Sequence, residues 1–331
     1  MPAIDVEADS AMGSQAETKS FSLISDDRLI QLYSAMLKCR ILEERISTLF
    51  KQSRVIGGNR FAAGREAAVT GAVIDLLPED TLSLSTLDLG ASFIKGVPLD
   101  RLFRQLFLSA AGSDMGNPSS GQMSYEPLRV LAASTGIGAL DVAISIASAN
   151  RSKQNGKIVV AFCGDGSGSL GMWHTVLDFA CLRELPILLV CYDRFLDESE
   201  DAGLQTGADE ISLKAQAQGI PSIPVDGVDV VAVYRVASEA IAHARKGFSP
   251  TIIECKTVRW DGHGDSDSAG AQVSGAADRR SANDPILSME RYLTGKGLFS
   301  QDLKAEVAGQ FKQELDAAIA RAQNPPIAES L

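Results

Sequence analysis

A glycine-rich turn after an apolar run carries the clearest chemical signal in this sequence. Cys163 ends the run, and Gly164, Asp165, Gly166 and Ser167 lead from it into a helical segment. Glycines let the backbone approach a phosphate closely, and the free N–H groups at a helix start favour an anion. An aspartate between the glycines repels a phosphate unless a divalent cation lies between them. The turn therefore suggests a metal-assisted phosphate site.

Two other interpretations fit the same turn. Residues 166–171 (GSGSLG) match the GxGxxG pattern of dinucleotide-binding folds, with Asp193 at the end of the next strand as a ribose-binding acid. In the third interpretation, the glycines serve only to permit a tight turn between strand and helix. The pattern by itself does not decide among the three.

The elements around the turn predict an α/β fold with a doubly wound parallel sheet and helices on both faces. Two apolar runs, 158–163 and 186–192, have the character of buried parallel strands, and the segments 222–225 and 251–255 are predicted as further strands of the same sheet. Helices over 172–184 and 229–245 separate them in the order expected of βαβ units. Asp193 and Arg194 close the second of these strands.

Helices dominate the other predicted elements. Ser25 and Asp26 offer N-cap oxygens to a long helix that ends near Gly57. Further helices are predicted after Gly64 as far as Pro78, and over 100–111, 138–150, 284–295 and 301–322. Polar, turn-rich segments at 112–127 and 260–283 predict two long loops. The opening third is thus expected to be mainly helical.

Charge and composition exclude several classes of protein. The 331 residues carry a formal net charge of -11 without a basic stripe, so no nucleic-acid partner is expected. No apolar run approaches the length of about twenty residues that a membrane span requires, so no membrane association is expected. Residues 1–22 lack the pattern of a signal or transit peptide and predict a disordered tail, followed by one domain over 23–331.

The cysteines indicate a reducing compartment. They are five in number and scattered, mostly within apolar strand or helix patterns: Cys39, Cys163, Cys181, Cys191 and Cys255. This distribution predicts buried free thiols and a cytoplasmic location.

The segment from Cys163 to Arg194 resembles the thiamine-diphosphate motif, which begins with GDG and ends in two asparagines at the close of the next strand. Other motifs follow in the order seen in alpha subunits of thiamine-diphosphate-dependent 2-oxo-acid dehydrogenase E1 components. They are LEER at 42–45, GREA at 64–67, Gly136-Ile137, DGVD at 226–229, Gly262-His263 and DPI at 284–286. The likeness spans about residues 26–322, which favours this family over the dinucleotide interpretation.

The resemblance implies a thiamine-diphosphate-binding fold and the cofactors thiamine diphosphate and Mg²⁺. It places six residues at the cofactor: Gly136, Gly164, Asp165, Gly166, Ser167 and Arg194. It also places Asp165 and Asp193 at the metal and His263 near the reacting centre. It further implies an E1 beta-type partner in an α2β2 assembly and a lipoyl-bearing E2 component. The implied reaction is oxidative decarboxylation of a 2-oxo acid with acyl transfer to lipoamide.

The sequence departs from the family at the second metal ligand. Asp193 and Arg194 occupy the positions of the two asparagines. A slip of one residue would let Asp193 bind the metal, or the Arg194 guanidinium replaces the metal and pairs the diphosphate directly. In a third interpretation, the two residues are only a solvated pair at the strand end.

The sequence also departs from the family where its members carry a Tyr and an Arg that touch the diphosphate and then an active-site His. Thr86, Leu87 and Leu89 stand there, and Arg60 stands where many members have His. Leucine can neither donate a hydrogen bond nor transfer a proton. A second hypothesis is therefore a non-catalytic paralogue that keeps the fold and assembles as a structural or regulatory subunit.

Overall fold

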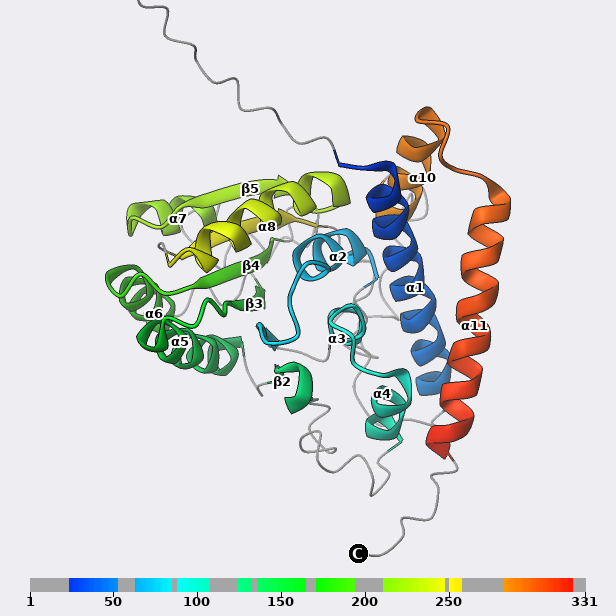
Figure 1. The fold of residues 1–331 in the computed structure, drawn as a ribbon, viewed down its shortest axis with the longest axis horizontal. Coiled ribbons are helices and arrows are strands. Elements are labelled where there is room, and N and C mark those ends of the chain that lie inside the picture. Colours follow the sequence, from blue (N-terminus) through cyan, green and yellow to red (C-terminus); the bar gives the residue numbers. More distant parts are fainter. Residues whose placement is uncertain are drawn as a thin grey trace, which may run out of the picture.

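A six-stranded parallel sheet forms the centre of the molecule (Figure 1). The computed structural model describes residues 24–52, 63–84, 88–107, 124–132, 136–164, 171–193, 211–247, 250–257 and 283–323. The strands are β1 (Thr81–Leu84), β2 (Val130–Ala132), β3 (Val159–Gly164), β4 (Ile187–Asp193), β5 (Ser222–Asp226) and β6 (Thr251–Lys256). Their order is β2-β1-β3-β4-β6-β5, and every neighbouring pair is parallel.

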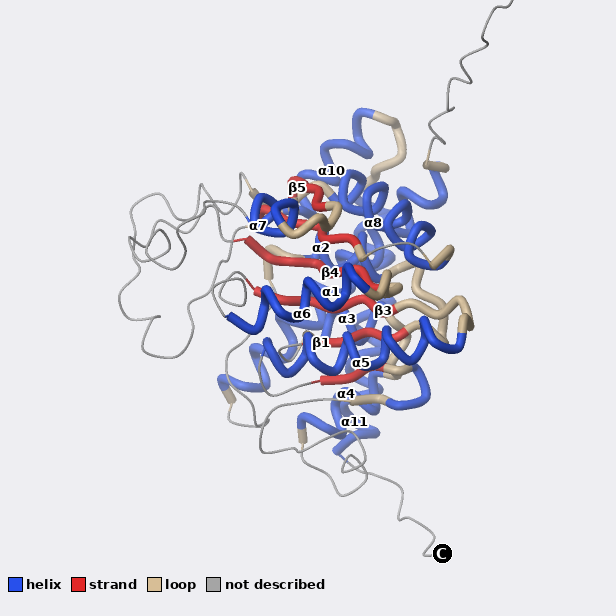
Figure 2. The backbone as a smooth tube through the Cα atoms, turned by 90° about the vertical axis from the view of Figure 1, so that its left-hand side faces the viewer, coloured by secondary structure: helices blue, strands red, loops and turns tan. Residues whose placement is uncertain are grey.

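Helices cover both faces of the sheet, as predicted. On one side lie α5 (Gly136–Lys153), α6 (Gly171–Leu182) and α7 (Ile211–Ala217), of which α5 and α6 lie in front of the strands in Figure 2. The other side holds α1 (Asp26–Lys51), α2 (Glu66–Val73), α3 (Leu89–Ile94), α4 (Leu99–Leu106), α8 (Val230–Arg245), α10 (Pro285–Gly295) and α11 (Gln301–Gln323). A short 3-10 helix, η3 (Glu126–Leu128), precedes β2.

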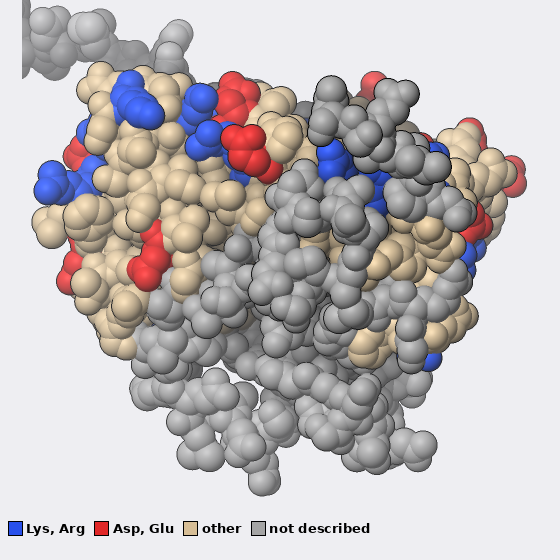
Figure 3. All heavy atoms as spheres, turned by 90° about the horizontal axis from the view of Figure 1, so that it is seen from below, with Lys and Arg blue, Asp and Glu red and all other residues tan. Residues whose placement is uncertain are grey.

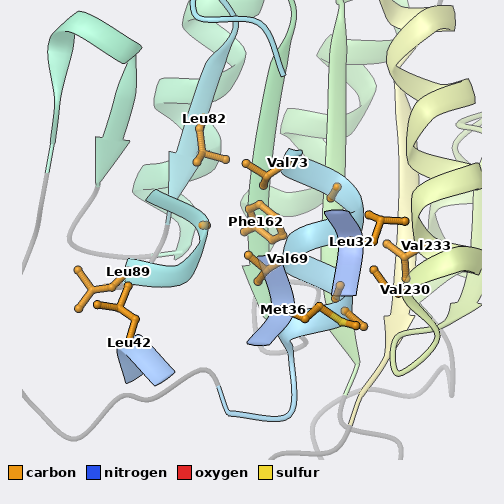
Figure 4. Packing of buried hydrophobic residues seen from close by; sticks show 14 of the residues in the cluster. Leu32, Met36, Leu42, Val69, Val73, Leu82, Leu89, Phe162, Val230 and Val233 are labelled. Atoms are coloured by element: carbon orange, nitrogen blue, oxygen red, sulfur yellow. The ribbon is translucent and has the colours of Figure 1, made fainter. Parts of the chain in front are cut away.

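Alternation along the strands creates two cores, one on each face. Val160 and Phe162 of β3 belong to the larger core. Figure 4 shows Phe162 among the buried residues of the helices on this face. Val159 and Ala161 of the same strand belong to the smaller core, beneath α5 and α6. Successive side chains of a strand point to opposite faces, so a strand covered on both faces must be apolar throughout. This is why β3 and β4 are recognisable as continuous apolar runs.

Side-chain caps start several helices at the predicted residues. The Ser25 hydroxyl accepts a hydrogen bond from the Arg28 N–H at 3.3 Å, and α1 begins at Asp26. The carboxylates of Asp229 and Asp284 accept from Val231 N–H and Ile286 N–H, each at 2.8 Å, at the starts of α8 and α10. Such caps satisfy N–H groups that have no partner inside the helix.

The prediction for the opening third of the chain was incomplete. It is helical, but β1 lies within it and β2 follows soon after, and the short helix α3 was also missed. β1 contains the polar Ser83, whose buried hydroxyl donates to the Ala139 carbonyl at 2.9 Å. A strand of 4 residues with a satisfied polar side chain carries too little apolar character to be recognised.

The cysteine prediction is confirmed for four of the five residues. Cys39, Cys163, Cys191 and Cys255 are buried, Cys181 is partly exposed, and all five are free thiols. The side chain of His174 on α6 is exposed and has no packing role in the core. None of the described helices combines the length and apolar character needed to cross a bilayer.

Candidate functional site

The carboxyl ends of the strands meet at one edge of the sheet because all strands run in the same direction. The chain leaves β1 toward β2 and leaves β3 toward β4, so the strand order reverses between β1 and β3. A reversal of this kind opens a crevice at the carboxyl edge where ligands of α/β proteins bind. We define the carboxyl edge by Leu84, Gly164 and Asp193, the last residues of β1, β3 and β4.

Three of the predicted site residues are described, and they lie at this edge. Gly164 is the last residue of β3 and pairs with Tyr192, while Asp193 is the last residue of β4. Gly136 is the first residue of α5, which follows β2. Asp165, Gly166, Ser167, Arg194 and His263 lie outside the described residues. Their roles stay predictions.

The backbone at Gly164 leaves room for a ligand. A Cβ atom placed on Gly164 would have none of the described residues within 4 Å. Helices α5 and α6 both begin at the carboxyl edge, since each follows a strand that ends there. Helix starts present unpaired N–H groups and the positive end of the helix dipole. The described part of the edge therefore fits the close approach of a diphosphate.

A cluster of the partly exposed Arg65 with the buried Asp88 and Tyr192 adjoins this backbone, and no sequence pattern predicted it. The Tyr192 hydroxyl donates to Asp88 Oδ2 at 3.4 Å, and the Ala91 N–H donates to Asp88 Oδ1 at 2.8 Å. The Arg65 guanidinium lies 4.5 Å from the centre of the Tyr192 ring. The opposite charges and the aromatic face hold three segments of the chain together.

Burial dominates the ionisation of this cluster. It raises the pKa of the Asp88 carboxyl, although the Ala91 N–H, the positive charge of Arg65 and the Tyr192 hydroxyl oppose the rise. It also holds the pKa of the Tyr192 hydroxyl well above its usual value, and the negative charge of Asp88 adds to the effect. Tyr192 is thus a neutral hydrogen-bond donor.

A second charged network fixes the turn that carries Arg65. The Gly64 N–H donates to Glu66 Oε2 at 2.9 Å, and Arg40 on α1 donates to Glu66 Oε1. Two further nitrogens of Arg40 donate to the two oxygens of Asp284, each at 3.2 Å. Burial raises the pKa of Glu66, and the hydrogen bond and charge of Arg40 lower it. The network joins α1, α2 and the start of α10 behind the carboxyl edge.

Glu254 fixes the chain on the other side of the edge. Its fully buried carboxylate on β6 accepts hydrogen bonds from the N–H groups of Ile211 at 3.1 Å and Ser212 at 2.9 Å. These are the first two residues of α7, the next described element after Asp193. A carboxylate at a helix start also interacts favourably with the helix dipole.

The described residues alone do not complete a metal site. No group of three or more His, Cys, Asp or Glu side chains in the described ranges could hold an ion. A hollow of about 350 Å³ lies against α11 and is lined by residues such as Val97, Glu314 and Arg321. It includes none of the strand ends. The carboxyl edge therefore remains the candidate site.

Fold and edge together define a doubly wound α/β protein whose strand order reverses between β1 and β3. A family model for the dehydrogenase E1 component matches residues 33–330. The pyruvate dehydrogenase E1 component subunit alpha of Staphylococcus aureus is 30% identical over 91% of this chain and 80% of its own length. This chain belongs to the dehydrogenase E1 component family, as a subunit of the alpha type.

Other relatives give the same result. The subunit alpha of acetoin:2,6-dichlorophenolindophenol oxidoreductase from Bacillus subtilis is 30% identical over 82% of each chain. The chloroplastic pyruvate dehydrogenase E1 component subunit alpha-3 of Oryza sativa subsp. japonica is 28% identical over 98% of this chain and 79% of its own length. These relatives differ in the substrates that their names specify.

Proposed function

We propose that the chain is the alpha subunit of a thiamine-diphosphate-dependent E1 component. The proposed reaction is oxidative decarboxylation of a 2-oxo acid with acyl transfer to lipoamide in the cytoplasm. The observation that carries the proposal is the space beside the Gly164 backbone in a chain of this family. Gly164 is the last residue of β3, and the strand order reverses between β1 and β3. Thiamine diphosphate, when bound, supplies the nucleophile and the electron sink.

Each predicted residue has a defined part in this proposal. Backbone N–H groups at Gly136, Gly164, Gly166 and Ser167 hold the diphosphate oxygens. The Asp165 carboxylate binds Mg²⁺, with Asp193 as the second ligand or with Arg194 in place of the ion. His263 moves a proton near the reacting carbon. Glu254 and the Arg40 network support the proposal because they fix the chain on both sides of this edge.

We also propose an E1 beta-type partner in an α2β2 assembly and a lipoyl-bearing E2 component. An exposed apolar surface on α6 supports a partner chain: Met172, Phe179 and Leu182 are 47%, 40% and 82% exposed. In Figure 3 the left-hand part of the described surface, on the side of α5 and α6, carries only scattered charges. Exposed apolar side chains gathered on one face are typical of protein interfaces.

Titration calorimetry of the chain co-expressed with a beta-type subunit tests the cofactor. The expected result is saturable binding of thiamine diphosphate that increases with Mg²⁺ and is lost in Asp165→Asn. The matched control is Asp141→Asn, an exposed aspartate on α5. Wild-type protein that assembles and binds no thiamine diphosphate would contradict the cofactor proposal. Lipoamide reduction with a panel of 2-oxo acids then identifies the substrate.

One observation favours a non-catalytic paralogue as the second candidate. Leu89, where the family resemblance implies an active-site His, is buried in the larger core as the first residue of α3 (Figure 4). Leu89 contributes to the packing of the core and supplies no proton donor at the carboxyl edge. Assembly with a beta-type subunit, together with absence of turnover for every 2-oxo acid, would favour this candidate.

A further inference from the structure

Arg65 is held in one place by backbone and aromatic contacts. It lies at the start of α2, between Gly64, which adopts the left-handed conformation at φ +91°, and the buried Glu66. The hydrogen bond from the Gly64 N–H to Glu66 closes this turn. The Tyr192 ring beneath the guanidinium stacks in turn on Phe162, with centroids 5.5 Å apart and planes at 22°. The cation is therefore preorganised.

The hydrogen-bonding capacity of the guanidinium is not used by the described residues. Within the described ranges, the Arg65 guanidinium forms no hydrogen bond and no ion pair, whereas the guanidinium groups of Arg40 and Arg245 are each bonded to two carboxylate oxygens or more. Contact with an aromatic face leaves the N–H groups in the guanidinium plane available. Asp88 is close enough to interact electrostatically, but its oxygens accept from Ala91 and Tyr192.

The position of Arg65 places this cation at the carboxyl edge. Helix α2 leads from Glu66 toward the start of β1, so the first residue of α2 lies at the opposite, carboxyl edge of the sheet. Tyr192 pairs with Gly164, whose backbone is open. Arg65 is partly exposed, and its guanidinium lies over Tyr192, which pairs with Gly164. It can bind a carboxylate or a phosphate group at this edge through two parallel hydrogen bonds.

We propose that Arg65 binds an oxyanion of the ligand at the carboxyl edge, either a diphosphate oxygen of the cofactor or the carboxylate of the 2-oxo acid. The inference rests on the proposed function and names a residue of its site. Tyr192 and Asp88 are positioning residues for Arg65, since they contact the guanidinium or the ring beneath it. Lysine at this position keeps the charge and loses the paired geometry.

The test measures binding of inorganic pyrophosphate, thiamine diphosphate, thiamine and pyruvate by calorimetry, using the chain assembled with its beta-type subunit. The variants are Arg65→Gln and Arg65→Lys. The control is Arg183→Gln, whose guanidinium lies 5.7 Å from the Phe179 ring after the end of α6, toward the opposite edge of the sheet. Thermal unfolding of each variant establishes that it is folded.

If the diphosphate is the ligand, Arg65→Gln weakens pyrophosphate and thiamine diphosphate about tenfold or more and leaves thiamine unchanged, because a hydrogen bond to a charged group contributes about 1.5–3 kcal/mol. If the carboxylate is the ligand, pyrophosphate is unchanged and the affinity for pyruvate falls by a similar factor. Arg65→Lys gives an intermediate loss in either case. Affinities equal to those of Arg183→Gln for every probe would overturn the inference.

These outcomes separate the inference from the proposed function. If the wild-type protein binds thiamine diphosphate, and Arg65→Gln changes the affinity for neither thiamine diphosphate nor pyruvate, the inference is wrong and the proposed function stands. If the protein binds pyrophosphate through Arg65 but does not bind thiamine diphosphate, the oxyanion site is supported and the cofactor proposal is wrong. A wild-type assembly that binds none of the four probes overturns both.

Discussion

Glu254 on β6 and Ser212 on α7 are 42 residues apart in sequence and are joined by a 2.9 Å hydrogen bond across the smaller core. The same carboxylate also accepts from the N–H of Ile211. Both oxygens of a fully buried acid are therefore used to start a single helix. The link connects the start of α7 to β6, the strand that pairs with β4.

Glu254→Ala is expected to lower the free energy of unfolding by about 1–3 kcal/mol, because two buried N–H groups lose their partner. Urea denaturation measures the loss, and amide hydrogen exchange at Ile211 and Ser212 should accelerate more than elsewhere. Glu239→Gln, on the exposed face of α8, is the control. Unchanged exchange at α7 would show that the carboxylate does not hold this helix.

Gly71→Ala is expected to destabilise the protein by about 1–3 kcal/mol through overpacking. A Cβ on Gly71 would lie 2.7 Å from Val233 Cγ1 and 2.8 Å from the Tyr234 backbone nitrogen, where α2 crosses α8. Gly309→Ala on α11 is the matched control, since its Cβ would have none of the described residues within 4 Å. The control is expected to be neutral or stabilising, because alanine favours helix. Equal midpoints in urea for both variants would contradict the close crossing.

Asp88→Asn is expected to change how stability depends on pH. Burial raises the pKa of the Asp88 carboxyl above its ordinary value of 3.8, so the native state keeps a proton that the unfolded state loses. This contribution to stability is present below about pH 4 and is lost as the pH rises toward the pKa of the folded state. Asparagine keeps the N-cap and removes the ionisation.

Urea midpoints measured for wild-type protein and Asp88→Asn between pH 4 and 7 test this sign. The variant should gain stability relative to wild type as the pH rises. The ionisable groups that face the Asp88 carboxyl are Arg65, Tyr192 and Cys39. They are present in both the wild-type protein and the variant. A difference that stays constant with pH would mean that Asp88 ionises as an ordinary surface acid.

Arg194→Asn tests the metal in the proposed function. If the Arg194 guanidinium stands in place of the ion, the asparagine restores an oxygen ligand and makes cofactor binding depend on Mg²⁺. Calorimetry with thiamine diphosphate in the presence of Mg²⁺ or of a chelator measures this dependence. Identical metal dependence in wild type and variant would argue against replacement of the metal by Arg194.

The sequence predicted the central strands of the sheet better than its short peripheral elements. β3 and β4 are continuous apolar runs because helices cover both faces, and such runs are visible without a structure. β2 has only 3 residues, and helix α7 has 7 residues and depends on Glu254 from a distant strand. Elements that depend on tertiary contacts leave little periodic signal.

The candidate site was predicted in the same uneven way. The positions of Gly164 and Asp193 at the ends of β3 and β4 follow from local pattern, since strand ends are local features. The Arg65 cluster does not, because Asp88 and Tyr192 are 104 residues apart and meet only when β1 and β4 enter one sheet. Neither residue belongs to a motif that would single it out.

The strand order also constrains the route by which the chain acquires its structure during synthesis. β6 lies between β4 and β5, so β5 has no neighbouring strand until the ribosome has released the chain through Lys256. Until then, the backbone N–H and C=O groups of residues 222–226 have no neighbouring strand to form hydrogen bonds with, and they can pair with strands of other chains. A chain truncated before Thr251 would lack the strand that connects β4 to β5, and a fragment of that kind should be recovered mainly as aggregate.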